Sequence, residues 1–272
     1  MAARSVLLIL FLALAILPAR ASEGMEAARD AYVRGRFEEA AELARSLGTS
    51  EGNALAARAE LAEGDYLAPP SERRARFEQA EKDARAAIAL DPQNPEGHLC
   101  LALALGFLGR LDGVVAAHFA GYADEARQHI DQALQLAPTN PWANALLGGW
   151  NLEIVHQGGL LGQAIYGASL EKGIAAYTYA LALDGGNAAI AYQYALQLVA
   201  LGGAWRRAEA RQALSNVLDA EPADASGRFA HQRAERLKRA LDTHDERELR
   251  AILADQFGAD TRKADGATGW PR

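Results

Sequence analysis

Apolar residues recur along this chain at the spacing of one helix face, and each stripe stops at a proline or glycine. The clearest stripe has four members before its proline: Phe77, Ala80, Ala84, Ala87 and then Pro92. Spacings of three and four predict one face of an α-helix, and the proline predicts its end. The same skeleton recurs twice, as Ala123, Ala126, Ile130, Ala133 and Pro138 and, more weakly, as Leu170, Gly173, Tyr177, Ala180 and Gly185. The pattern therefore predicts a repeat protein made of helices.

Composition supports an all-α chain. Half of the 272 residues are apolar, much of that half is alanine, and only 7% of the residues are aromatic. Alanine is the best helix former, and little alternation of β-branched residues is present to build a sheet. An α-solenoid needs no single central core, because each unit buries its apolar face on its neighbours.

The frame set by the glycines and prolines resembles the tetratricopeptide repeat (TPR), a helix hairpin of about 34 residues. The best-matched positions are Ala28, Gly35, Phe37 and Ala40 in the first unit; Ala57, Gly64, Phe77, Ala80, Ala87 and Pro92 in the second; and Ala102, Gly109, Ala123 and Pro138 in the third. The match covers about 24–222 and weakens in units four and five. The resemblance implies a right-handed α-solenoid whose first helices line a concave groove.

Units two to four are about a dozen residues longer than the repeat pattern expects. The extra residues fall between the two helices of each unit, near 67–76, 112–122 and 156–169. Inserts at one edge of a solenoid can form a shared surface, here with the aromatic residues Phe119, Tyr122 and Tyr166. Two arrangements stay open: the inserts fold back and fill the groove, or they extend it.

A narrower resemblance concerns residues 130–184. This run is similar to the repeat domain of regulator-of-microtubule-dynamics proteins and their bacterial relatives, which have long insertions and a Leu-Leu-Gly-x-Trp motif. The corresponding residues here are Leu146, Leu147, Gly148 and Trp150. The resemblance implies a fold, and microtubule binding is not carried over to a chain with an export signal.

The termini predict export and a capped array. Residues 1–21 are predicted to be a signal peptide, because they contain a basic Arg4, an apolar run from Val6 to Leu17 and an Ala-Arg-Ala ending. Cleavage is expected near Ala21–Ser22, and an uncleaved membrane anchor is the alternative. About five repeats are expected at 22–222, followed by charged helices at 223–257 that cap the array. The alternative for these charged helices is a coiled coil that binds a partner. A disordered tail is expected at 258–272. Export places the protein in the periplasm, and the Ala- and Arg-rich composition suggests a Gram-negative source.

The net charge and the reactive residues exclude several classes of function. Removal of the signal peptide changes the formal net charge from −7 to −9, which disfavours nucleic acid and anionic lipid as partners. The only cysteine, Cys100, lies in an apolar run and is expected to be buried. No nucleophile or phosphate-loop motif occurs, and the six histidines show no metal-ligand spacing, so neither an enzyme nor a metal or other cofactor is predicted.

The groove is expected to run along the first helix of each unit. Counting from Pro95, Pro141 and Ala188 as unit starts predicts these groove residues: Glu96, Leu99, Leu103, Trp142, Ala145, Gly149, Glu153, Tyr192 and Leu196. Family members that clamp a terminal carboxylate place Lys, Arg and Asn there, and this groove has almost none. Its aromatic and leucine residues instead suit an apolar or aromatic segment.

Two functions follow from these observations. The first is a non-catalytic scaffold or adaptor that binds another envelope protein or a peptide segment, with no stable membrane anchor once the signal is removed. The alternative is a carrier that holds a small molecule or lipid in an apolar pocket between the groove and the inserts.

Overall fold

Helices make up the regular structure of residues 22–258, which are the residues that the computed structural model describes, and no strand occurs among them. The predicted all-α class is confirmed. The predicted signal peptide at 1–21 and nearly all of the predicted tail, at 259–272, lie outside these residues. The elements are a helix at 22–33, α2 (Phe37–Ser46), α3 (Ser50–Ala62), η1 (Glu63–Leu67), α4 (Pro70–Leu90), α5 (Pro95–Asp112), α6 (Val114–Phe119), α7 (Tyr122–Leu136), α8 (Pro141–Glu153), η2 (Ile154–Gly158), α9 (Gly159–Tyr166), α10 (Leu170–Leu183), α11 (Ala188–Ala200), α12 (Ala204–Ser215), α13 (Ala225–Asp242) and α14 (Glu246–Phe257).

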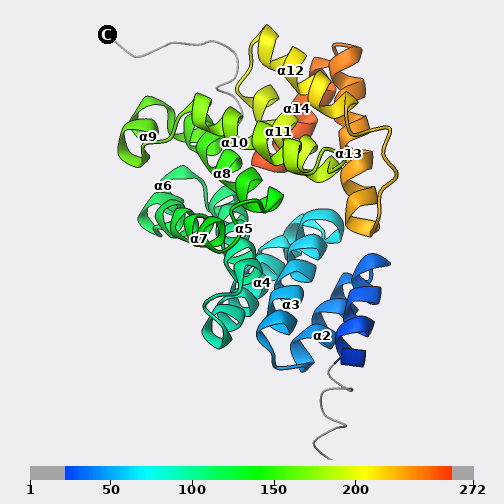
Figure 1. Cartoon of the computed structure of the whole chain (residues 1–272). Coiled ribbons are helices and arrows are strands. Elements are labelled where there is room, and N and C mark those ends of the chain that lie inside the picture. The colour runs from blue at the N-terminus through cyan, green and yellow to red at the C-terminus, as the bar shows by residue number, and fades with distance from the viewer. Residues whose placement is uncertain (1–21, 259–272) are drawn as a thin grey trace, which may run out of the picture.

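The helices stack as successive hairpins (Figure 1). The helix at 22–33 precedes α2, and the later hairpins are α3 with α4, α5 with α7, α8 with α10, and α11 with α12. Alanines fill the early contacts: Ala40, Ala80 and Ala84 are fully buried. Small side chains let the helix axes approach closely, which explains the high alanine content.

Asparagine caps set where the first helix of a hairpin begins. The Asn94 side chain accepts hydrogen bonds from the backbone N–H groups of Glu96 and Gly97, and Asn140 does the same for the start of α8. In both helices proline occupies the first turn, where its missing N–H has no helical partner to lose. The Asn-Pro pair after each closing turn thus ends one unit and starts the next.

The three inserts take different forms. The first adds the π-helical segment η1 and lengthens α4 at its N-terminal end, the second forms α6, and the third forms η2 and α9. Helices α6 and α9 lie at the same edge of the molecule (Figure 1), where a hydrogen bond joins His118 Nδ1 to the Tyr166 hydroxyl. His118 and Tyr166 are 48 positions apart in sequence, so this hydrogen bond joins the second insert directly to the third.

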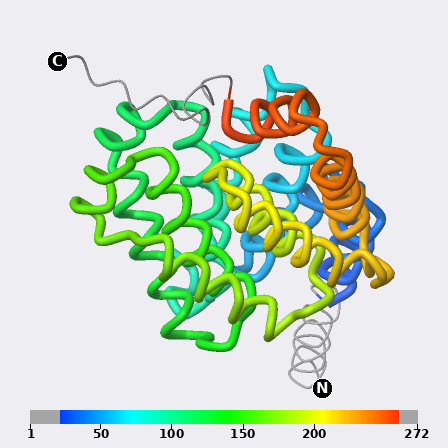
Figure 2. The backbone as a smooth tube through the Cα atoms, turned by 90° about the horizontal axis from the view of Figure 1, so that it is seen from above, coloured from blue at the N-terminus to red at the C-terminus, as the bar shows by residue number. Residues whose placement is uncertain are grey.

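Helices α13 and α14 close the solenoid on itself. Helix α13 packs on α11 and α12, and it also reaches the first units, where Phe229 stacks on Tyr66 with ring centroids 5.5 Å apart. Arg233 donates to the Asp65 carboxylate at 2.9 Å and to the Asp65 carbonyl oxygen. Figure 2 shows the result: the last helices lie beside the first ones, so the two ends of the array meet.

A histidine pair joins α5 to α7. The Nδ1 atoms of His98 and His129 are 2.8 Å apart, and His98 Nε2 lies 3.0 Å from the Pro92 carbonyl oxygen. Because a carbonyl only accepts, His98 donates from Nε2; its neutral form then accepts at Nδ1 from the Nδ1–H of His129. The contact fits two neutral imidazoles.

We expect acid to weaken the fold through this pair. Burial, together with the neighbouring His98 ring, lowers the pKa of His129 below its ordinary value of 6.5. The His129 imidazole therefore binds a proton less tightly in the folded chain than in the unfolded chain. The neutral ring stabilises the fold fully above about pH 6.5, and this stabilisation is lost as the pH falls below that value, because the unfolded chain then takes up the proton first. Urea unfolding from about pH 7.5 to about pH 5.5 measures the loss, and His129→Gln should reduce it. An unchanged pH dependence in that variant would contradict the assignment.

Candidate functional site: the central cavity

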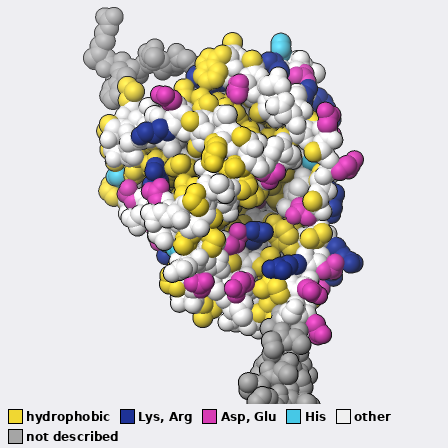
Figure 3. Space-filling model, viewed as in Figure 1, with side chains coloured by type: hydrophobic (Ala, Val, Ile, Leu, Met, Phe, Trp, Pro, Cys, Tyr) yellow, Lys and Arg dark blue, Asp and Glu magenta, His cyan; other side chains and the backbone are white. Residues whose placement is uncertain are grey.

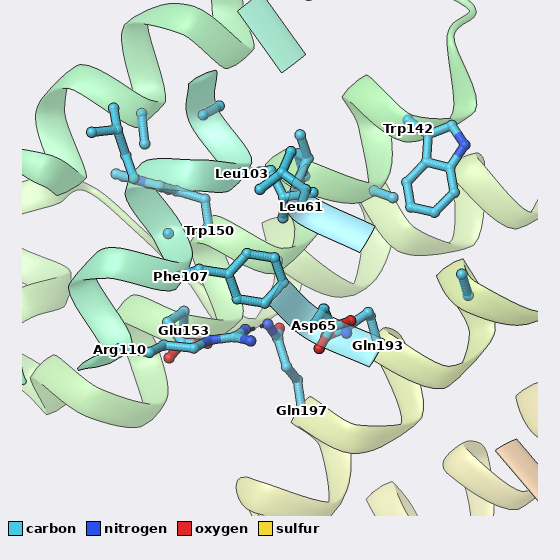
Figure 4. Close-up of a pocket in the computed structure, with 18 of the residues that line it drawn as sticks. Leu61, Asp65, Leu103, Phe107, Arg110, Trp142, Trp150, Glu153, Gln193 and Gln197 are labelled. Atoms are coloured by element: carbon cyan, nitrogen blue, oxygen red, sulfur yellow. Dashed lines mark hydrogen bonds and ion pairs between the residues drawn. The ribbon is translucent and has the colours of Figure 1, made fainter. Parts of the chain in front are cut away.

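A half-open cavity of about 1160 Å³ is lined mainly by the first helices of the hairpins, together with residues of α6, α7 and α9 and of the C-terminal segment. Its walls are mainly apolar and include Leu61, Leu103, Phe107, Trp142 and Trp150, which Figure 4 shows around one space. On the face drawn in Figure 3, hydrophobic side chains gather around the middle of the molecule, and many charged ones lie nearer its edges. A concave, mainly apolar space with a few polar groups is typical of a binding site.

Most of the predicted groove residues meet in this cavity. Leu103 of α5 lines it together with Trp142, Gly149 and Glu153 of α8. Glu96, Leu99 and Ala145, which the same frame predicted, line it too. Counting from the Asn-Pro starts of α5 and α8 therefore identified residues that share the cavity wall; that they bind a partner stays a prediction.

The prediction for α11 was wrong by one residue. Tyr192 is 4% exposed and Leu196 is fully buried, and both belong to a core that includes Leu237 of α13. The residues of α11 that line the cavity are Gln193 and Gln197. The physical reason is the returning helix α13, which covers the face of α11 that would otherwise border the groove.

The inserts extend the cavity wall. Tyr122 and Tyr166 line the cavity and are partly buried, whereas Phe119 is 84% exposed and is absent from its wall. Leu161 of α9 lines the cavity and is still 72% exposed, so it forms part of a rim. For the second and third inserts the structure has the second of the two arrangements left open by the sequence, in which they extend the groove; no residue of the first insert, at 67–76, lines the cavity.

A polar cluster interrupts the apolar wall. Arg110 donates to Glu153 Oε2 at 2.9 Å, and Gln197 Nε2 donates to the same oxygen at 3.4 Å. Burial disfavours the charge on Arg110, but Glu153, together with smaller contributions from Tyr177 and Asp65, outweighs that cost, and the pKa of Arg110 is raised above its ordinary value. The guanidinium also lies 4.9 Å from the centre of the Phe257 ring. Figure 4 shows Arg110, Glu153 and Gln197 meeting beside Phe107.

Sequence reasoning missed Phe107, Arg110, Gln193 and Gln197. A signal for the first two was present, since Phe107 and Arg110 continue the helix face of Leu99 and Leu103 at helical spacing. These two residues were missed because the 34-residue repeat pattern expects a shorter first helix than α5, which continues to Asp112. No local signal identified the two glutamines, because their exposure to the cavity depends on where α13 packs.

The residues considered for metal or thiol chemistry are engaged elsewhere. His129 pairs with His98, and His118 pairs with Tyr166. Over residues 22–258, no three His, Cys, Asp or Glu side chains come together in a geometry that could hold a metal ion. Cys100 is buried, and burial raises the pKa of its thiol. Within the same range, no helix combines the length and apolarity needed to cross a bilayer.

Comparisons with solved structures support the repeat fold. A crystal structure of a thermophilic TPR protein from Thermus thermophilus aligns with a TM-score of 0.57 at 20% identity, covering 79% of this chain and 98% of that one. At this identity the similarity shows the fold alone. The predicted TPR-like α-solenoid is confirmed.

Comparisons at the sequence level identify the family. Regulator of microtubule dynamics protein 3 of Bos taurus is 27% identical over 123 residues, which are 43% of this chain and 26% of that protein. The chain thus matches only about a quarter of that relative's length. The family model described as "Regulator of microtubule dynamics protein 1-3" matches residues 38–242, from α2 to the end of α13. With that match over most of its length, the chain belongs to the family of regulators of microtubule dynamics 1-3.

Proposed function

We propose that this protein is a non-catalytic scaffold or adaptor that binds an apolar or aromatic segment of another protein in its central cavity. The observation that carries the proposal is the cavity itself, because its wall is formed by the first helices of the TPR-like hairpins. Solenoids present that concave face to their partners. Trp142, at 39% exposure, supplies an accessible aromatic surface of the kind that dominates binding energy at interfaces.

Replacement of Trp142 by alanine should weaken partner capture at least about tenfold, since truncating an aromatic anchor typically costs about 2 kcal/mol or more. A photo-crosslinking amino acid at Leu161, an exposed residue of the cavity rim, keeps Trp142 in place and first identifies the bound protein in cells. Calorimetry with that protein then measures the affinity of Trp142→Ala.

Trp205→Ala is the matched control. Trp205 is 52% exposed on α12 and lies outside the cavity wall, so its loss should leave capture unchanged. Circular dichroism should show the same helix content in both variants. If Trp142→Ala captured the partner as well as Trp205→Ala does, the cavity would no longer be a candidate for the partner-binding site.

A small-molecule or lipid carrier is the second candidate, favoured by the way α13 and α14 close the solenoid around the cavity. Known ligand pockets measure roughly 300–1,000 Å³, and this cavity reaches that scale. Native mass spectrometry of the purified chain separates the candidates. A co-purifying small molecule of constant mass would favour the carrier, and its absence together with a crosslinked protein would favour the scaffold.

We place the protein in the periplasm, where another envelope protein would be its partner. Support comes from residues 1–21, which have the basic start, apolar run and Ala-Arg-Ala ending of a secretory signal. Cell fractionation followed by N-terminal sequencing tests this placement. A mature chain that begins near Ser22 in the periplasmic fraction is expected; an intact N-terminus in the cytoplasmic fraction would contradict it.

A further inference from the structure

Two insert helices, α6 and α9, carry the most exposed large apolar side chains of residues 22–258. The four highest exposed fractions in that range are 86%, 84%, 72% and 71%, and they belong to Leu160, Phe119, Leu161 and Val115. Helix α6 has no buried residue, and α9 has only Gly162. Exposed apolar side chains that gather in one place mark an interaction surface.

The two helices form one surface, which we call the insert surface. His118 of α6 is hydrogen-bonded to the Tyr166 hydroxyl of α9, and their rings meet edge to face with centroids 6.0 Å apart. Both helices lie at the same edge of the molecule (Figure 1). Leu160 and Phe119 are not part of the cavity wall. The insert surface is therefore distinct from the site proposed for the scaffold function.

Charge is excluded from the insert surface. Residues 113–123 and 154–170 contain no Asp, Glu, Lys or Arg, although these four residue types make up 23% of the chain. Charged side chains are costly near the hydrocarbon of a bilayer, so their exclusion suits contact with lipid. The residues that follow the two runs, Asp124 and Glu171, are acidic, and the chain has a net charge of −7. Both features disfavour an anionic lipid surface and leave a zwitterionic one.

The kinds of side chain distinguish a bilayer from a protein partner. Hot spots between proteins are enriched in Trp, Tyr and Arg, and Leu and Val are under-represented there. The exposed apolar residues of the insert surface have the opposite composition: Val114, Val115, Phe119, Leu160, Leu161 and Ile165. Leu, Ile, Val and Phe are the residues whose insertion into a bilayer is most favourable. With six and eight residues, α6 and α9 are far shorter than the roughly 20 residues that span a bilayer, so they suit its interface.

We propose that α6 and α9 dock the protein on a zwitterionic phospholipid bilayer, with Leu160 and Phe119 inserted among the upper parts of the acyl chains. The attachment is peripheral and reversible, because it depends on a few side chains. Tyr166 suits the headgroup region, where tyrosine is enriched in membrane proteins. Leu161 and Ile165 belong both to the insert surface and to the cavity wall, so docking holds the cavity next to the membrane. This membrane contact goes beyond the scaffold function.

A fluorophore at position 160 tests the insertion directly. Leu160→Cys in the full chain can be labelled selectively with nitrobenzoxadiazole, since the native Cys100 is only 3% exposed. Phosphatidylcholine vesicles should shift the emission of this dye to shorter wavelength, because the dye enters an apolar environment. The readout is local to the labelled position, so attachment through the predicted signal sequence would leave it unchanged. An emission that vesicles do not shift would overturn the proposal.

Leu90→Cys is the matched control. Leu90 is 57% exposed and is the last residue of α4. Arg74 near the start of the same helix bonds Asp112 beside the second insert, which places Leu90 about 24 Å further along the helix. A dye at position 90 should keep its emission when vesicles are added. An equal shift at both positions would show that the insert surface is not what meets the bilayer.

Phe119→Asp in the chain labelled at position 160 tests whether the two helices act together. The lipid concentration at half-maximal shift should rise at least about tenfold, since an inserted aromatic side chain is replaced by a charge. Leu90→Asp should leave that concentration unchanged. Circular dichroism should show the same helix content in both variants, since both positions are exposed. A titration that Phe119→Asp does not alter would contradict docking through both helices.

Other occupants of the insert surface have their own outcomes. Sedimentation velocity without vesicles should show a monomer, and a dimer that Leu160→Asp dissociates would assign the surface to a second copy of the chain instead. Vesicles of phosphatidylglycerol should shift the dye at position 160 less than phosphatidylcholine vesicles do. A larger shift with phosphatidylglycerol would overturn the assignment to a zwitterionic bilayer.

Discussion

Gly148→Val should lower the free energy of unfolding by about 3 kcal/mol, the upper range for forcing extra volume into a packed contact. A Cβ atom at Gly148 would lie 2.6 Å from Tyr177 Cδ2 and 3.0 Å from the Gly173 carbonyl oxygen. Helices α8 and α10 therefore touch through this position, and Tyr177 is too enclosed to move away. Urea unfolding followed by circular dichroism measures the change.

Gly106→Ala is the matched control for that substitution. Gly106 lies inside α5, and a Cβ atom there would meet nothing within 4 Å. The alanine should stabilise the chain by about 0.5–1 kcal/mol, because glycine is a poor residue for a helix interior. A valine at position 148 that costs less than about 1 kcal/mol would contradict a close contact between α8 and α10.

Arg233→Met should cost about 2 kcal/mol, below the cost of breaking a fully buried ion pair, because this pair is only partly buried. The substitution keeps an apolar stem but leaves the partly buried Asp65 carboxylate without its guanidinium. It also removes the cation–π contact with Tyr66, where the guanidinium lies 4.6 Å from the ring centre. Since these contacts join α13 to the second hairpin, hydrogen exchange should speed up in α13 and at the end of α3.

An exposed ion pair provides the comparison. Arg34 and Asp30 are both substantially exposed, so Arg34→Met should change the free energy of unfolding by about 0.5 kcal/mol or less. Equal effects of the two substitutions, or unchanged hydrogen exchange in Arg233→Met, would show that the contact with Asp65 does not hold the solenoid closed.

The candidate site was predictable where local rules govern it. Leu103, Trp142, Gly149 and Glu153 were found because Asn-Pro caps fix the start of α5 and α8, and helical spacing then fixes which residues share a face. Tyr192 and Leu196 were misplaced because the same count was applied to α11, whose neighbour is α13. A repeat frame describes contacts between successive units, and it contains no information about a helix that returns from the end of the chain.

The sequence by itself determined the helices, their pairing and the positions of the inserts, because helix periodicity, caps and glycine contacts act over a few residues. Only the tertiary structure decided how the array closes. Arg233 and Asp65 are 168 positions apart, and no local pattern relates them. That closure borders the cavity, buries Tyr192 and Leu196, and leaves Gln197 in the cavity wall, since each of these depends on packing between residues that are distant in sequence.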